Sequence, residues 1–333
     1  MYKIKQIPED FIVKEISNIN LENNGQYSYF LLKKTNYSTV RAIEVLAEKL
    51  KIPLKNIGFA GNKDKNAVTE QKISIFRGSR NFENINLRNI ELKHIGNGKI
   101  PISLGDLEGN EFTITIRNLD GNEIEKIKNL KTKKICVPNF FGSQRFSKNN
   151  DLVGKSIIKK DFRKAVELIL ENEGIVEENI KKYLEDNKND HVGALRLVPL
   201  KTRKLFVHAY QSYLFNSIAS EYLDDNKEKR IKNIQVPIIG FNFDVGTIRS
   251  NSLKSIIKKI LGEEKLSPRD FIISQMPELT SEGTFRDLFF ELKNLKILEI
   301  TEDEFNNGKK KAIINFTLPK SCYATTLIEF IFC

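Results

Sequence analysis

The sequence predicts an α+β protein in which antiparallel strands are interspersed with helices. Several segments alternate apolar and polar residues, which is the period of a half-buried strand, and others repeat apolar residues at helical spacing. At 333 residues the chain exceeds the usual size of one hydrophobic core, so we expect two domains. A hydrophobic content of 40% gives no sign of overall disorder.

The first 150 residues carry the clearest strand patterns. In the segment from Phe112 to Arg117, apolar side chains fall on every second residue and share one face. A helix is expected after Ser38 or Thr39, either of which can cap it, and Pro53 follows its end. The strands predicted in this part are residues 27–33, 57–60, 68–76 and 112–117.

Helical patterns dominate from about residue 150 onward. The longest, over residues 203–222, carries an apolar stripe that we expect to be buried. This stripe consists of Leu205, Phe206, Ala209, Tyr210, Tyr213, Leu214 and Ile218. The other expected helices are residues 161–170 and 177–184, with smaller elements at 253–261 and 270–273 and strands at 295–300 and 312–318.

The chain is strongly basic. Its 54 Lys and Arg against 43 Asp and Glu give a net charge of +11, which favours a polyanionic partner such as nucleic acid. A Lys-rich chain can also be basic without binding an anion, and each basic run is also interpretable as solvated surface. The candidate runs for backbone contacts are Lys131, Lys133 and Lys134, then Lys227, Lys229 and Arg230, and Lys309 to Lys311 after an expected exposed turn.

Other classes of protein find little support in the sequence. The three cysteines and three histidines lack the spacing of a disulfide framework or a metal site. The first residues lack the apolar stretch of a signal peptide, and no run approaches the roughly 20 apolar residues of a membrane span. We therefore expect a cytoplasmic protein with no membrane association.

Residues 61–71, GNKDKNAVTEQ, place Asp64 in a short, basic, glycine-led loop between two predicted strands. Lys63 and Lys65 flank Asp64, and neighbouring positive charge favours an ionised carboxylate at neutral pH. Such a carboxylate at the end of a sheet can act as a nucleophile or a base. The alternative is a polar β-turn without chemical function.

Three other segments combine aromatic, amide and basic residues, and together with the Asp64 loop they resemble the TruD family of pseudouridine synthases. Singly, each is a candidate for stacking on bases or an ordinary packed turn. Five segments occur in the order and rough spacing of that family. They are PEDFIVKE (8–15), the Asp64 loop, VPNFFGSQRF (137–146), AYQSYLFN (209–216) and FTLPKSCYAT (316–325). The chain departs from the family pattern at Ser321 and Cys322, where a glycine and a serine are usual, so the geometry of this loop is in question.

The resemblance implies the domain organisation. A pseudouridine synthase-type catalytic domain with a mixed or antiparallel sheet would comprise residues 1–149 and 294–333. An inserted TRUD α+β domain would comprise residues 150–293.

The resemblance also implies an isomerase that acts on tRNA without cofactor or metal. It would break the C1′–N1 bond of a uridine, typically uridine 13, and rejoin the uracil through C5. Relatives accept other RNAs as well. No obligate protein partner is evident, and we expect a monomer.

By motif match, Asp64 would be the nucleophile or base. Lys5 would be its ion-pair partner, and Lys63 would add local positive charge. Attack at C1′, attack at C6 and removal of a proton from C2′ all remain open for Asp64.

The nucleotide-binding residues follow from the same match. Phe11, Phe141 and Tyr323 would stack on the extruded base. Asn139 can bond the uracil edge, because its amide offers both donor and acceptor. Arg145 would contact the RNA backbone or, as we favour, support the loop.

Two rival functions deserve comparison with this hypothesis. A non-catalytic RNA-binding protein that retains the fold would not need the Asp64 carboxylate beside a phosphodiester chain. A nuclease would need metal-binding carboxylates or a pair of histidines, and neither is evident.

Overall fold

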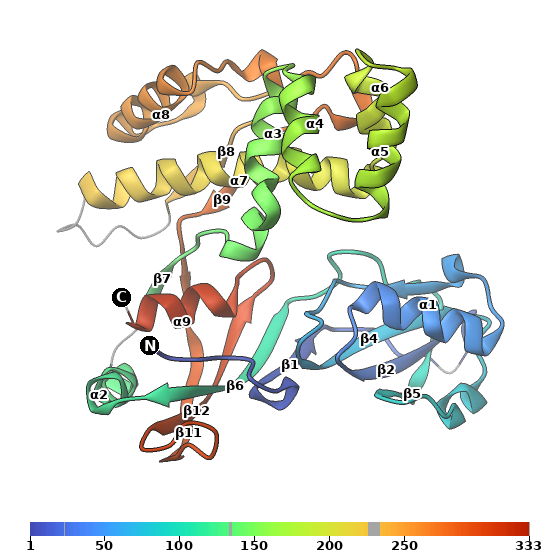
Figure 1. Cartoon of the computed structure of the whole chain (residues 1–333). Coiled ribbons are helices and arrows are strands. Elements are labelled where there is room, and N and C mark those ends of the chain that lie inside the picture. Colours follow the sequence, from blue (N-terminus) through green and yellow to red (C-terminus); the bar gives the residue numbers. More distant parts are fainter. Residues whose placement is uncertain (23, 133–134, 226–233, 333) are drawn as a thin grey trace. The chain divides into compact units, whose positions relative to one another are not determined.

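The computed structural model describes residues 1–22, 24–132, 135–225 and 234–332 (Figure 1). The chain divides into two compact units, Met1–Val137 with Phe290–Cys333, and Pro138–Phe289. These divisions fall near the predicted domain boundaries at 149 and 294, but differ from them. The assignment of a catalytic and an inserted domain stays a prediction.

The first unit is built on an eight-stranded mixed sheet. The strand order is β11-β12-β6-β1-β4-β2-β5, and β3 pairs with β4 beside this path. The strands are β1 (Phe11–Ile16), β2 (Tyr27–Thr35), β3 (Ile57–Phe59), β4 (Val68–Phe76), β5 (Ile90–Gly98), β6 (Gly109–Leu119), β11 (Lys293–Glu302) and β12 (Lys310–Pro319). Each strand predicted from alternation is present, and β4 has the predicted limits.

The register of three central strands brings distant segments to one end of the sheet. β1 and β4 run parallel, with Ile12 opposite Val68. β2 runs antiparallel to β4, with Lys34 opposite Thr69. The starts of β1 and β4 and the finish of β2 therefore meet, and the loop that contains Asp64 lies directly before β4.

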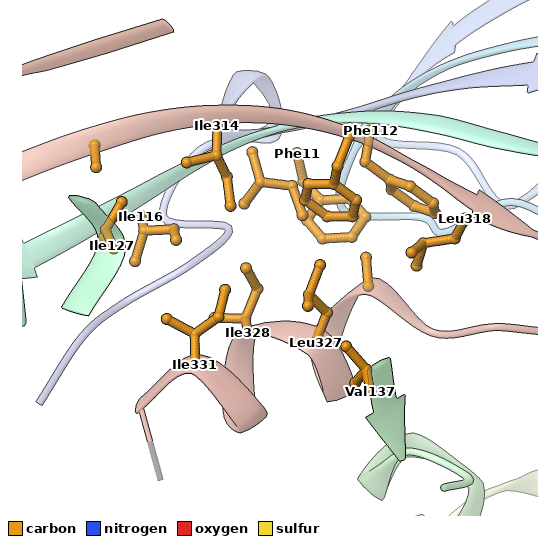
Figure 2. Close-up of a cluster of buried hydrophobic side chains, with 14 of the residues drawn as sticks. Phe11, Phe112, Ile116, Ile127, Val137, Ile314, Leu318, Leu327, Ile328 and Ile331 are labelled. Atoms are coloured by element: carbon orange, nitrogen blue, oxygen red, sulfur yellow. The ribbon is translucent and has the colours of Figure 1, made fainter. Parts of the chain in front are cut away.

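Helices cover the sheet through two apolar clusters. Between the sheet and α9 (Ala324–Phe332) lies a cluster that includes Phe11, Phe112 and Leu327 (Figure 2). A second cluster joins α1 (Thr39–Leu50) to β2 and β4. Ser38 caps α1, as expected, by accepting a hydrogen bond of 3.2 Å from the backbone N–H of Arg41. The unit also contains α2 (Gly121–Lys128).

The second unit is mainly helical. Its helices are α3 (Asn150–Ile158), α4 (Phe162–Leu170), α5 (Ile175–Asp186), α6 (His191–Arg196), α7 (Leu200–Asp225) and α8 (Asn251–Glu263). β8 (Gln235–Ile238) pairs with β9 (Thr284–Asp287) in this unit. β7 (Cys136–Pro138) pairs with β10 (Phe289–Glu291), and most residues of these two strands belong to the first unit. Short 3-10 turns occupy Pro8–Asp10, Leu54–Asn56, Arg80–Asn84, Asn129–Thr132, Ser143–Asn149, Val245–Thr247, Pro268–Phe271 and Pro277–Leu279.

Most of the predicted stripe of α7 is buried, but Leu205 is only half-buried and Tyr213 is exposed. Phe206, Ala209, Tyr210 and the aliphatic residues that follow them are in the core. Tyr213 is 39% exposed, and its ring stacks on that of Tyr210 with the ring centroids 5.9 Å apart. The prediction that Tyr213 is buried was therefore wrong. Among the described residues, none of the helices combines the length and the apolar character of a membrane span.

A buried ionic network holds the N-terminal segment of the first unit. The guanidinium of Arg117 on β6 contacts Asp10 at 2.9 Å and Asp303 at 3.0 Å, and all three side chains are at most 3% exposed. Asp10 also accepts hydrogen bonds from the backbone N–H groups of Gln6 and Ile7. The network therefore fixes the chain just before β1.

We predict that the free energy of unfolding of Asp303→Asn falls less steeply than that of the parent protein as the pH is lowered. Burial raises the pKa of Asp303, but hydrogen bonds to its carboxylate outweigh burial and hold the pKa at about 2. The donors are the backbone N–H groups of Asn118 and Phe305 and the side chains of Asn306 and Arg117. A depressed carboxyl pKa contributes stability that is present above about pH 4 and lost as the pH falls through the folded-state value. Urea unfolding of both proteins between about pH 5 and 2 measures this slope.

Asp106→Asn is the matched control, since Asp106 is an exposed loop aspartate of the same unit. It should keep the parent slope. Equal slopes for Asp303→Asn and the parent protein would contradict the prediction.

Candidate active site

The loop that contains Asp64 is held by buried polar side chains. Thr39 accepts a hydrogen bond from the Lys63 backbone N–H and donates one to Gln71, each at 2.8 Å. Gln71 in turn donates to the carbonyl of Gly61 at 3.1 Å. Thr39 is 1% exposed and Gln71 is fully buried. Gln71, the last residue of the segment GNKDKNAVTEQ, therefore anchors the loop.

Asp64 presents a carboxylate with a cation fixed beside it. Its side chain is 37% exposed, and its Oδ2 lies 2.6 Å from Nζ of Lys5. The same Nζ lies 4.0 Å from the ring centroid of Phe11. The backbone of Lys5 has a φ of +59°, which costs a non-glycine residue about 1–3 kcal/mol. The Arg117–Asp10 network next to Lys5 maintains this conformation.

The ring of Phe11 belongs to the hydrophobic core. It is 2% exposed and packs edge-to-face on Phe112 at a centroid distance of 6.0 Å. Its observed contact with the site is the one with the Lys5 ammonium. Stacking of Phe11 on a base stays a prediction.

Lys63 forms a buried ion pair with Glu15 of β1. The atoms Nζ and Oε2 are 2.7 Å apart, and the two side chains are 5% and 1% exposed. Glu15 also accepts from the backbone N–H of Lys72 on β4. Lys63 therefore ties the loop to the sheet, and an electrostatic effect of Lys63 on the reaction stays a prediction. The role of Glu15 was not predicted.

Lys34, at the end of β2, was also missed by the sequence analysis. It is fully buried, and its ammonium donates to the carbonyls of Tyr37 at 2.6 Å and Asp64 at 3.0 Å. The signal was present in the alternation of β2, where Phe30, Leu32 and Lys34 share the buried face. A lysine at the buried phase of a strand requires polar partners inside the fold.

The second unit contains Asn139 and its neighbours. Arg286 donates to the backbone carbonyl of Asn139 at 2.9 Å and to its side-chain oxygen at 2.6 Å. The Asn139 Nδ2 donates to the carbonyl of Asp287 at 3.0 Å. The amide is thereby oriented, and an asparagine amide retains capacity for one more donor and one more acceptor bond. Recognition of uracil by Asn139 stays a prediction.

Phe141 is held by the AYQSYLFN segment of α7. Its backbone N–H and carbonyl both bond the amide of Asn216, at 2.9 and 3.0 Å. Its ring, 8% exposed, lies edge-on to Phe215 and has the guanidinium of Arg286 4.2 Å from its centroid. Arg145 donates to Ser212 at 3.2 Å, a contact that supports the loop. Roles of Phe141 and Arg145 toward RNA stay predictions.

The loop before α9 shows how the chain accommodates its departure from the family pattern. Ser321 has a φ of +67°, the left-handed conformation that a glycine adopts without strain. Tyr323 is partly exposed, and its carbonyl accepts from Leu327 N–H at 3.4 Å in the first turn of the helix. The stacking role of Tyr323 stays a prediction.

The structure describes only some of the basic residues that were candidates for contacts with the RNA backbone. Lys133, Lys134, Lys227, Lys229 and Arg230 lie outside the described residues. Lys310 and Lys311 belong to β12, where they pair with Glu302 and Glu304 at 3.8 and 2.6 Å. The expected exposed turn therefore ends before these two lysines. Within the described ranges, no group of three or more His, Cys, Asp or Glu could hold a metal ion.

Comparison with known proteins defines the class of this fold and site. A solved structure of the TruD protein of Methanosarcina mazei superimposes with a TM-score of 0.75 at 30% identity, over 98% of this chain and 92% of that chain. The fold is therefore that of a pseudouridine synthase. The family model described as tRNA pseudouridine synthase D (TruD) matches residues 2–181, 170–232 and 224–330. The chain belongs to the TruD family, and the predicted family and α+β class are confirmed.

Curated relatives match at nearly full length. The tRNA pseudouridine synthase D of Aquifex aeolicus is 31% identical over 99% of this chain and 98% of its own. A probable tRNA pseudouridine synthase D of Methanosarcina acetivorans is 31% identical over 98% of this chain and 91% of its own. The identification as an isomerase of this family therefore rests on the whole chain and not on one motif.

We predict that Ser321→Gly stabilises the protein. The substitution removes the backbone strain of a serine in the left-handed conformation, which is worth about 1–3 kcal/mol. Glycine also stabilises the unfolded chain by increasing its entropy, and this opposing free energy is somewhat smaller. A net gain of about 1 kcal/mol in the free energy of unfolding is expected. Urea unfolding measures it, and Ser103→Gly, in an exposed loop of the same unit, is the control. A loss of stability in Ser321→Gly would show that the serine side chain matters more than the strain.

Proposed function

We propose that this protein converts one uridine of tRNA, uridine 13, to pseudouridine, with Asp64 acting as nucleophile or base on an extruded nucleotide. The observation that carries the proposal is the partly exposed carboxylate of Asp64 held 2.6 Å from the Lys5 ammonium. The names of the relatives supply tRNA as the substrate class. The choice of uridine 13 follows from the family resemblance.

The reaction suits a site of this kind. The C1′–N1 bond breaks, a C1′–C5 bond forms, C5 loses its proton and N1 gains one. No electrons are gained or lost, so a positioned carboxylate and a means of holding the detached uracil are the principal requirements. The cation of Lys5 favours the ionised carboxylate that each of the three candidate roles of Asp64 requires at the outset.

The predicted nucleotide-binding residues would hold the base. Extrusion of a nucleotide costs a few kcal/mol, which stacking on aromatic rings can offset. Phe141 would supply such a ring, with Phe11 and Tyr323 as further surfaces. Asn139, oriented by Arg286, would bond the uracil edge with its remaining donor and acceptor.

We predict that Asp64→Ala abolishes isomerisation and preserves tRNA binding, because the carboxylate is needed for the bond exchange and contributes no attraction to phosphate. Tritium release from tRNA labelled with 5-³H-uridine measures turnover, and filter binding measures affinity. Mapping of pseudouridine in the product tests position 13. Asp106→Ala, at an exposed aspartate of the same unit, should stay active.

The outcomes separate the rival functions. Activity in Asp64→Ala would refute the role of this carboxylate. Tight tRNA binding by a parent protein that releases no tritium would favour the non-catalytic RNA-binding protein. Shortened tRNA after incubation with magnesium would indicate a nuclease.

We predict that Phe141→Ala lowers kcat more than it weakens tRNA affinity. A ring that stacks on the extruded base contributes about 1–3 kcal/mol, which corresponds to about a 5- to 150-fold loss of turnover. Single-turnover rates at saturating enzyme separate this loss from binding. Phe285→Ala removes a ring that is 46% exposed in the same unit and is the control. Equal losses of rate and affinity would make Phe141 a binding or folding residue.

A further inference from the structure

We propose that Lys34 is a positioning residue for the reaction: its buried ammonium fixes the backbone of Asp64 and supplies positive charge near the carboxylate. This inference rests on the proposed role of Asp64. It assigns a function to a side chain that belongs to none of the aromatic or carboxylate motifs of the sequence.

The geometry shows Asp64 held from two directions. Lys5 pairs with the carboxylate at 2.6 Å, and Lys34 donates to the backbone carbonyl of the same residue at 3.0 Å. A second bond from Lys34 to the carbonyl of Tyr37, at 2.6 Å, joins the Asp64 loop to the segment between β2 and α1. Movement of Asp64 along or across the sheet end would break one of these contacts.

The use of a cation here requires an explanation. Lys34 is fully buried, and no carboxylate of the described residues lies within ion-pair distance of it. Burying an ammonium without a counter-ion costs several kcal/mol, whereas two carbonyls can be satisfied by neutral donors. Burying the charge of Lys34 therefore costs free energy that hydrogen bonding to the two carbonyls does not by itself require. Stabilising an ionised carboxylate nearby is a function that only the charge can perform.

The charged groups around Lys34 determine when this charge is present. Burial lowers the pKa of the Lys34 ammonium to about 8; the charge of Asp64 raises this pKa and that of Lys63 lowers it. Lys63 is itself paired with Glu15, and Lys5 is paired with the Asp64 carboxylate. Lys34 is therefore charged at pH 7 and loses its proton as the pH rises above about 8.

The experiment compares pH profiles of single-turnover tritium release for the parent protein, Lys34→Met and Lys34→Arg. Misplacement of a catalytic group costs about 10- to 100-fold, so Lys34→Met should lose that much turnover at pH 7. Its remaining rate should lack the decline above about pH 8 that we expect of the parent protein. Lys34→Arg keeps its charge throughout this range and should retain more activity than Lys34→Met, without the decline.

Lys33→Met is the matched control. Lys33 precedes Lys34 on β2, has a side chain 43% exposed, and pairs at 3.5 Å with Glu91. It should keep the parent rate and profile. Circular dichroism melting, performed on every variant, reports whether the fold persists.

Each outcome decides a specific point. Parent-like turnover and pH profile in a folded Lys34→Met would overturn the role of Lys34, while inactive Asp64→Ala would leave the proposed function standing. An active Asp64→Ala would overturn both. Failure of both Lys34 variants to fold would make Lys34 a folding residue and would also end the proposal. Equal turnover losses in Lys33→Met and Lys34→Met would show a general effect of charge.

Discussion

The parallel pairing of β1 with β4 is the constraint on which the site depends. Parallel neighbours start at the same end of a sheet, so the segments that precede both strands emerge together. One segment carries Lys5 and the other Asp64, which are 59 positions apart in the chain but joined at 2.6 Å. The antiparallel β2 delivers Lys34 to the same place. Sheet register thus assembles three charged groups that no local sequence pattern connects.

The buried polar groups around the Asp64 loop fix its conformation more than they increase the stability of the fold. Thr39 and Gln71 satisfy the loop backbone, and the Glu15–Lys63 pair is almost completely buried. Apolar replacements of buried ion pairs are often no less stable, so such groups are weak contributors to stability. Their value here is in holding a short loop in one conformation, because every buried polar atom accepts only a narrow range of partner positions.

Much of the fold could be predicted from the sequence, because strand and helix periods are local properties. The alternation from Phe112 to Arg117 and the cap at Ser38 both appear in the structure. Tyr213 was misassigned because helical spacing does not distinguish the centre of a buried face from its margin. Lys34 and Glu15 were missed because their importance depends on strand register. Asn139 was proposed from its motif, but its partner Arg286 lies 147 positions away and has no local signal.

The Glu15–Lys63 ion pair joins two motifs of the sequence, PEDFIVKE and GNKDKNAVTEQ. Losing either side chain alone would leave an uncompensated charge inside the sheet, which costs about 3–5 kcal/mol. That is a large part of the stability of an ordinary domain. We therefore expect a change at position 15 or 63 to be tolerated only with a matching change at the other, so the two positions should covary among related sequences.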